Sequence, residues 1–308
     1  LVVAASASGA PPTGRAGRLG QVPLVPDGAS IEHVDHVYRR TPQGELSLHF
    51  SLPARRDRAN GQPAIVFFFG GGWKSGSFSQ FVPQADYFAS RGMVAACADY
   101  RIASVHGTTP DACVEDAKAA VRWLREHAAD FRIDTDRIVA AGGSAGGHLA
   151  ACTAVVPGFE PADATVSSRP NAVVLFNPAL NIDELVRNGR AKPAITREVV
   201  EAITPNRFLA ADAPPGVIFF GSDDPLVQGA EAYLAKAGPL GVRAELWIAE
   251  GQPHGFFNRP PWIQVTARKA DEFLVSLGYL EGPPTVELPQ DAPALVRRTA
   301  APAAGAAP

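Results

Sequence analysis

Three features that would point to particular classes of protein are scarce in this sequence of 308 residues. The formal net charge is only −3, which creates no strong field of either sign, so no nucleic-acid partner is expected. The three cysteines are an odd number, which predicts no disulfide framework. No run approaches the roughly 18 apolar residues of a membrane span, so none is predicted. The expected partner is therefore a small molecule or a neutral polymer.

Apolar residues, by contrast, make up 46% of the chain, which is enough for a large core. Residues 30–280 are predicted to form the working domain. Residues 1–29 open on LVVAASASGAPP, which is typical of the end of a signal peptide and predicts a secreted or periplasmic protein. The alternative is the loose terminus of a cytoplasmic protein. Residues 281–308 are rich in proline and alanine and predict an extended or disordered tail.

Short apolar runs alternate with helical patterns between these ends, which is typical of a mostly parallel α/β sheet with helices on both faces. Eight strands are predicted. Two runs that alternate apolar and polar residues, 31–40 and 44–53, should pair antiparallel at a sheet edge. The other six are continuous apolar runs, at 64–70, 93–100, 137–143, 172–178, 217–224 and 244–251. Helices are predicted at 109–131, 231–240 and 265–277, and a small or partial cap at 181–211.

The run RIVAAGGSAGGHLA contains the pattern G-x-S-x-G, with Ser144 between Gly142 and Gly146. A strand precedes it and a helix-compatible run follows it, which is the context of a nucleophile elbow. Glycines suit this turn because a strand-to-helix reversal brings backbone segments too close for side chains. A phosphate-binding turn, or packing alone, is the alternative for the motif taken by itself. The elbow predicts Ser144 as a nucleophile and the amide of Ala145 as an oxyanion donor.

A serine nucleophile needs a base, and the base needs an acid that fixes its tautomer. Asp223 and Asp224 lie at the end of one predicted strand, and His254 follows the next. Both positions lie at strand carboxyl ends, where a parallel sheet gathers its active-site loops. Asp224 is favoured as the acid, and Asp223 is expected to cap a helix or to hydrogen-bond within the loop.

Three glycines, Gly70–Gly72, directly follow a central strand, where bare amides can converge on one oxyanion. A plain flexible loop is the alternative. Trp73 and Phe256 lie near the motif loops, and Asn177 lies at a strand end. We predict that these three contact the substrate, although aromatic residues in such loops belong to the core at least as often.

The other histidines predict no metal site. His33 and His36 are three residues apart on a predicted strand, so they face opposite sides of the sheet. His148 follows Ser144 by four residues on a predicted helix, where a packing or hydrogen-bonding role is expected.

Five motifs in this order, FGGGW, ADYRIA, GGSAGGHLA, SDDPLV and HGF, resemble those of the α/β-hydrolase fold. Within it the chain resembles esterases of the hormone-sensitive-lipase type and the related acetyl-xylan or feruloyl esterases, from about Gly61 to Leu277. The resemblance implies catalysis without a metal or organic cofactor. This chain has Phe69 where the family has a histidine, and the loss of that side-chain hydrogen bond should weaken the support of the oxyanion loop. The residues it implies are Ser144 as nucleophile, Asp224 as acid, His254 as base, and the amides of Gly71, Gly72 and Ala145 as oxyanion donors.

These expectations combine into a serine carboxylesterase that acts on short acyl esters. Its substrate would be a small-molecule or carbohydrate ester, with acetyl or feruloyl esters implied by the resemblance alone. A serine peptidase or another acyl hydrolase on the same fold is the nearest alternative. A non-catalytic binding protein is the other, although such proteins commonly lack a member of the triad. The sequence predicts no oligomeric state.

Overall fold

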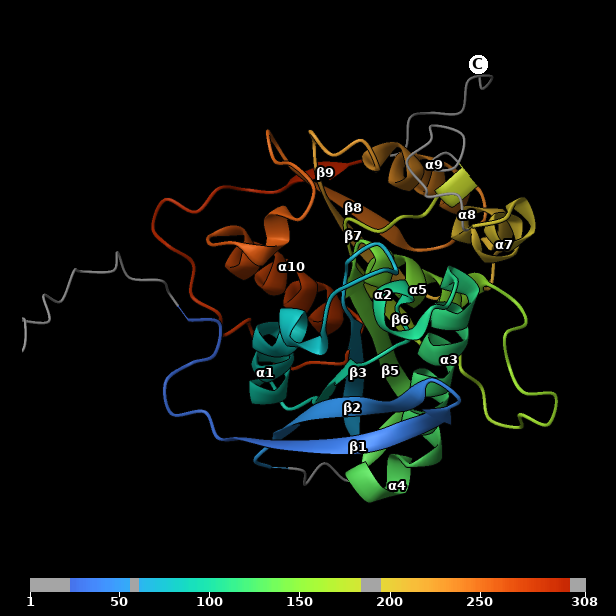
Figure 1. Cartoon of the computed structure of the whole chain (residues 1–308). Coiled ribbons are helices and arrows are strands. Elements are labelled where there is room, and N and C mark those ends of the chain that lie inside the picture. The colour runs from blue at the N-terminus through green and yellow to red at the C-terminus, as the bar shows by residue number, and fades with distance from the viewer. Residues whose placement is uncertain (1–22, 56–60, 184–194, 300–308) are drawn as a thin grey trace, which may run out of the picture.

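The computed structural model describes residues 23–55, 61–183 and 195–299. Nine strands of this described part form one sheet, in the order β1-β2-β4-β3-β5-β6-β7-β8-β9, with helices on both faces (Figure 1). This confirms the predicted α/β fold. The strands are β1 (Ile31–Thr41), β2 (Gly44–Pro53), β3 (Gln62–Phe68), β4 (Val94–Ala98), β5 (Ile133–Gly143), β6 (Ala172–Phe176), β7 (Gly216–Gly221), β8 (Ala244–Ala249) and β9 (Val296–Arg298).

The centre of the sheet is parallel and its two edges are antiparallel. Strands β4, β3, β5, β6, β7 and β8 run parallel to one another, and most of their residues are buried. The hairpin of β1 and β2 adds an antiparallel edge, as the alternating pattern predicted. The carboxyl ends of the central strands therefore open onto one rim of the sheet, where loops can gather functional groups.

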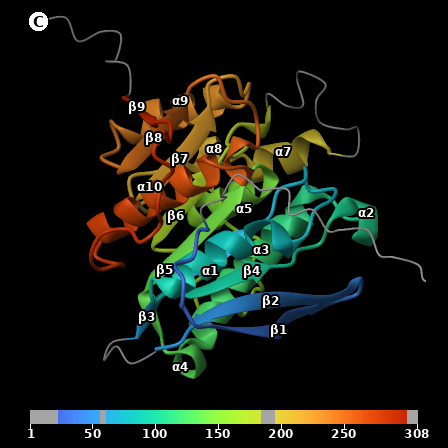
Figure 2. The ribbon, with the colours of Figure 1, turned by 90° about the vertical axis from the view of Figure 1, so that its left-hand side faces the viewer.

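Helices cover both faces of the sheet, and the sheet separates the core into two apolar clusters, one on each face. On one face the apolar cluster includes residues of α3 (Pro110–Glu126), α5 (Ala145–Val155) and α9 (Val227–Ala237). On the other it includes residues of α1 (Val82–Ser90) and α10 (Trp262–Ser276), the face seen in Figure 2. The short helices are α2 (Ala103–His106), α4 (Ala128–Phe131), α7 (Arg197–Ile203), α8 (Pro205–Phe208), η1 (Phe78–Phe81) and η2 (Phe256–Asn258).

The C-terminal segment corrects one prediction. Residues 281–308 were expected to be an extended or disordered tail, and eight strands were expected, but β9 lies in this segment and pairs antiparallel with β8. Val286 of the same segment is buried against the core face of α10. A three-residue strand carries too little alternation to be predicted locally. This strand forms through contacts with distant residues. It pairs with the edge of β8, and the guanidinium of Arg297 lies 5.9 Å from the centre of the Trp247 ring.

Parts of two predictions concern residues outside the described ranges. Residues 1–22, on which the signal-peptide interpretation rests, are among them, and so are residues 184–194 of the predicted cap. The described part of the cap contains α7 and α8, which pack against α3 and α5. None of the helices that the structure describes is long and apolar enough to cross a membrane. Cys97, Cys113 and Cys152 are all free and buried.

Candidate active site

Ser144 lies in the turn between β5 and α5. Its φ of 55° and ψ of −118° are strained for a residue with a side chain, as the nucleophile elbow requires. Two hydrogen bonds stabilise this conformation. The Ser144 amide donates to the Phe176 carbonyl at 2.8 Å, and the Ser144 carbonyl accepts from the His148 amide at 3.0 Å. The turn therefore presents the serine at the carboxyl end of the central strand.

The glycines beside Ser144 provide the clearance that was predicted for them. A Cβ on Gly142 would lie 2.5 Å from the Gly146 backbone, and one on Gly146 would lie 2.0 Å from the Phe68 carbonyl oxygen. Both distances are too short for real atoms, so a side chain at either position would force β5, α5 and β3 apart. The packing of the elbow against the neighbouring strand explains this part of the motif.

Three side chains that are far apart in sequence form one hydrogen-bonded line. His254 Nε2 lies 2.8 Å from Ser144 Oγ, and His254 Nδ1 lies 2.6 Å from Asp224 Oδ2. Since the carboxylate can only accept, Nδ1 carries the hydrogen and Nε2 is free to accept the serine proton. The Asp224 side chain is 1% exposed and that of His254 is 40% exposed. The line thus runs from a buried charge to an accessible hydroxyl.

The surroundings of Asp224 separate it from Asp223. Its Oδ1 accepts from the Leu226 amide at 3.0 Å, and its Oδ2 accepts from Asn177 Nδ2 at 2.8 Å. Asp223 is exposed and accepts only from the hydroxyl of Ser222 among the described side chains. The structure therefore brings Asp224, and not its neighbour, to His254.

Asn177 differs from the expectation that it contacts substrate. Its side chain is completely buried, with Nδ2 on Asp224 and Oδ1 accepting from the Gly255 amide at 3.3 Å. It leaves no surface on which a substrate could rest. The sequence marked Asn177 as a site residue because it lies at the end of a strand. That position does not tell whether its side chain binds the substrate or positions Asp224.

The loop predicted to bind the oxyanion begins at Gly70, which lies next to Ser144. A Cβ on Gly70 would lie 3.3 Å from that of Ser144. The amides of Gly71 and Gly72 donate no hydrogen bond to any other described residue. The amide of Ala145, the first residue of α5, lies at the helix N-terminus, where amides have no partner within the helix. These three amides are therefore free to bind an oxyanion beside Ser144.

Phe69 occupies the position of the family's histidine and supports the loop by packing. Its ring stacks on Tyr100 with centroids 4.1 Å apart, and the Tyr100 hydroxyl donates to the Phe69 carbonyl at 2.7 Å. Both side chains are buried. Aromatic stacking and a main-chain hydrogen bond therefore anchor the start of the loop in this chain.

Gln80 of η1 connects the oxyanion loop to the histidine loop and was not predicted. Its Oε1 accepts from the Gly70 amide at 2.6 Å, and its Nε2 donates to Asn258 Oδ1 at 3.2 Å. Asn258 Nδ2 in turn donates to the Gly255 carbonyl, next to His254, at 3.1 Å. No local pattern marks Gln80, because its partners lie 10 and 178 residues away.

Trp73 and His148 form a buried pair behind the oxyanion loop. Trp73 Nε1 donates to His148 Nδ1 at 3.2 Å, and His148 Nε2 donates to the Ile203 carbonyl at 2.8 Å. Burial lowers the pKa of His148 to about 4, so the ring stays neutral and its single hydrogen serves Ile203. His148 has the packing role that was expected. Trp73, expected to contact substrate, is only 9% exposed and is held by this bond.

A cavity of about 330 Å³ opens beside His254. Phe256, the third expected substrate contact, lines it together with Trp262, and the two rings meet edge to face with centroids 5.4 Å apart. Both side chains are largely buried and form an apolar wall. Ser144 is not among the residues that line this cavity, but its hydrogen-bond partner His254 is, so the cavity is a candidate recess for part of a substrate.

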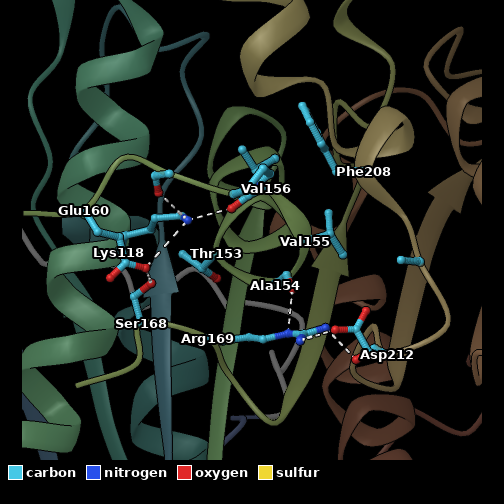
Figure 3. A pocket seen from close by; sticks show the side chains of 13 residues that line it. Lys118, Thr153, Ala154, Val155, Val156, Glu160, Ser168, Arg169, Phe208 and Asp212 are labelled. Carbon is cyan, nitrogen blue, oxygen red and sulfur yellow. Dashed lines mark hydrogen bonds and ion pairs between the residues drawn. The ribbon is translucent and has the colours of Figure 1, made fainter. Parts of the chain in front are cut away.

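A second cavity, of about 390 Å³, lies at the other end of α5 (Figure 3). Its charged side chains already have partners. Lys118 Nζ donates to the carbonyls of Val156 and Gly158 at 2.6 and 2.7 Å, and Arg169 Nη1 pairs with Asp212 at 2.7 Å.

The described residues contain no group of three or more His, Cys, Asp or Glu side chains that could hold a metal ion. His33 and His36 point to opposite faces of the sheet, as predicted. His33 bonds Asp86 of α1 at 2.7 Å, whereas the His36 ring lies against Phe131 of α4.

A family model and several curated relatives match this chain. The model of the BD-FAE family matches residues 48–237, more than half of the chain. A probable isoprenylcysteine alpha-carbonyl methylesterase of Arabidopsis thaliana is 27% identical over 243 residues, which are 71% of this chain and 50% of the relative. Carboxylesterase NlhH of Mycobacterium tuberculosis is 27% identical over 239 residues, 70% of this chain and 73% of the relative. The chain spans about half the length of the first of these relatives.

Solved esterase structures share both the fold and much of the sequence. Thermogutta terrifontis esterase 2 phosphonylated by cyclosarin matches with a TM-score of 0.74 and 43% identity, over 83% of this chain and 97% of that chain. The same esterase with propionate bound matches with a TM-score of 0.73 and 42% identity, over the same shares.

Proposed function

Because the chain belongs to the BD-FAE family of α/β-hydrolase esterases, we propose that it is a serine carboxylesterase in which Ser144, His254 and Asp224 form the catalytic triad. The observation that carries the proposal is the continuous hydrogen-bonded line from Asp224 through His254 to Ser144. The three groups stand in the order that acyl transfer needs, since a buried carboxylate orients the imidazole and the imidazole faces an accessible hydroxyl.

In the proposed reaction, Ser144 Oγ attacks the ester carbonyl carbon while His254 Nε2 takes its proton. The carbonyl oxygen becomes an oxyanion and is bound by the amides of Gly71, Gly72 and Ala145, which have no competing acceptor. The carbon–oxygen bond to the alcohol then breaks, and His254 returns the proton to the departing alcohol. Water, activated by the same histidine, attacks the acyl-serine and releases the acid.

Short acyl groups are the proposed substrates. The recess beside His254 is small, about 330 Å³, and no described segment forms a large cap over it. Thermogutta terrifontis esterase 2, the similar solved esterase, is known with propionate and with butyrate bound. Acetyl esters of carbohydrates belong to this class. The family resemblance adds feruloyl esters, whose acyl group is larger, and we propose both as sources of substrate.

The test uses Ser144→Ala, with Ser104→Ala of α2, an exposed serine away from the triad, as the matched control. Hydrolysis of p-nitrophenyl acetate and butyrate should fall by about 10⁴-fold or more in Ser144→Ala, and stay within about twofold in the control. A fluorophosphonate should label the unmodified protein on Ser144, located by peptide mass mapping. Unchanged turnover in Ser144→Ala, or no adduct at Ser144, would overturn the proposal, and the absence of an adduct would favour a binding protein on a hydrolase fold.

A further inference from the structure

The recess beside His254 has an uneven distribution of charge. Its walls come from one continuous stretch of chain that runs from the histidine loop through η2 to the start of α10. Among the described residues that line it, Arg259 is the only titratable one apart from His254, and none carries a carboxylate. The lining residues are Gln252, Pro253, His254, Gly255, Phe256, Arg259, Pro260, Pro261 and Trp262.

Arg259 has unused hydrogen-bonding capacity. The residue is exposed, and its side chain makes no ion pair or hydrogen bond with any residue in the described ranges. Most other arginines of the described chain are paired. Arg101, for example, contacts both Asp116 and Glu115, and Arg91 pairs with the buried Asp271. Arg259 therefore offers a cation to whatever enters the recess.

The backbone of Arg259 is firmly held. Its amide donates to the Phe256 carbonyl at 3.2 Å, and its carbonyl accepts from the Ile263 amide at 3.0 Å, which ties it to both η2 and α10. Two prolines follow it, and prolines restrict the backbone. The cation is thus carried by a rigid corner that also positions the apolar wall of Phe256 and Trp262. An anion bound by Arg259 would lie at the recess that His254 also lines.

We propose that Arg259 binds a carboxylate on the substrate, so that the recess selects esters whose acyl or alcohol part carries a negative charge away from the reacting carbonyl. The inference rests on the proposed esterase function. A guanidinium fork matches a carboxylate in a bidentate geometry. A monoanion fits best because no second cation lines the recess to balance the greater charge of a phosphate. The apolar wall accommodates the carbon chain between carboxylate and ester.

The experiment compares pairs of esters that differ in one charge. For a carboxylate on the acyl side the pair is mono-4-nitrophenyl glutarate and 4-nitrophenyl pentanoate. For a carboxylate on the alcohol side it is 4-acetoxybenzoate and methyl 4-acetoxybenzoate. The ratio of kcat/KM within each pair, corrected for spontaneous hydrolysis, is measured for the unmodified chain and for Arg259→Gln. Arg40→Gln, which removes an equal charge from the β1–β2 hairpin, is the matched control.

In at least one pair, Arg259→Gln should lower kcat/KM for the anionic ester by about tenfold, mainly through KM, because the lost charge-assisted contact is formed in the ground state as well. The neutral partner should change by less than about twofold, and Arg40→Gln should change neither. Arg259→Lys should retain part of the preference, since it keeps the charge and loses the fork. The pair that responds identifies the side of the ester that enters the recess.

An unchanged ratio in both pairs would overturn the inference while leaving the esterase function intact. An equal loss for charged and neutral esters would overturn it as well, because it would mean that Arg259 supports the fold of the histidine loop. If the unmodified chain hydrolyses none of the four esters, the esterase proposal itself fails, which is a separate and recognisable result.

Discussion

The two ends of α5 face sites of opposite chemistry. At the N-terminal end, Ser144, the exposed part of His254 and the amides of the oxyanion loop have free hydrogen-bonding capacity. At the C-terminal end, the carbonyls of Ala154 and Val156 accept from Arg169 and Lys118 (Figure 3). The helix dipole accounts for both, since its N-terminus favours developing negative charge and its C-terminus favours cations.

The difference shows that the number of charged groups does not identify a functional site. The C-terminal cavity has more of them, and nearly all are engaged with one another or with main-chain carbonyls. They hold the loop after α5 against α3. The N-terminal site has fewer, arranged in a line that ends at an accessible oxygen. The following three changes test this contrast, in order of expected effect.

The largest effect is expected for Asp224→Asn, which removes the buried charge at the start of the triad. Without it, His254 loses the partner that fixes its tautomer and stabilises the imidazolium, so kcat for p-nitrophenyl butyrate should fall by about 10³- to 10⁴-fold. The thermal unfolding midpoint reports whether the fold persists.

Asp223→Asn is the matched control for this change, because Asp223 is adjacent in sequence but exposed and away from His254. Its kcat should stay within about twofold of the unmodified value. Equal losses in the two variants would contradict the assignment of the acid to Asp224.

An intermediate effect is expected for Gln80→Ala, which removes the acceptor of the Gly70 amide and the link to Asn258. A displaced oxyanion loop weakens the transition state more than the ground state. We therefore expect kcat to fall by about 10- to 100-fold with little change in KM.

Gln80→Glu keeps the acceptor for Gly70 and loses the donor to Asn258, so it should recover part of the rate. Ser79→Ala, on the same turn of η1, should leave kcat nearly unchanged. A loss confined to KM in Gln80→Ala would argue that Gln80 contacts substrate and does not position the loop.

The smallest effect on catalysis is expected at the other end of α5. Lys118→Met keeps the apolar stem and leaves the buried carbonyl of Val156 and the part-buried carbonyl of Gly158 without their donor. Stability should fall by about 1 to 3 kcal/mol in urea unfolding, with kcat unchanged. Lys236→Met removes similar contacts to two carbonyls at the surface and should cost less than about 0.5 kcal/mol.

Burial works against the ammonium of Lys118 and lowers its pKa, because the charge is partly removed from water. If Lys118→Met proved as stable as the unmodified chain, this desolvation would outweigh the two hydrogen bonds, and the cavity would not be held together in the way described.

Residues with a strong local signal were predicted, and residues defined by distant contacts were not. Ser144, Asp224 and His254 each follow a buried strand, so the parallel sheet brings them to one rim whatever the details of packing. Gln80 and β9 have no such signal, since each depends on a partner elsewhere in the chain. Asn177 was noticed at a strand end, but its burial under the histidine loop reversed the expected role.

The strand order along the chain, the elbow and the triad members follow from local patterns, because periodicity and glycine spacing are constraints between neighbouring residues. The hydrogen bond of Asn177 to Asp224, the replacement of the family's histidine contact by the stack of Phe69 on Tyr100, and the free guanidinium of Arg259 appear only in the folded chain. Each depends on which groups from distant segments lie within hydrogen-bonding or packing distance, and only the closed sheet and its loops bring those groups together.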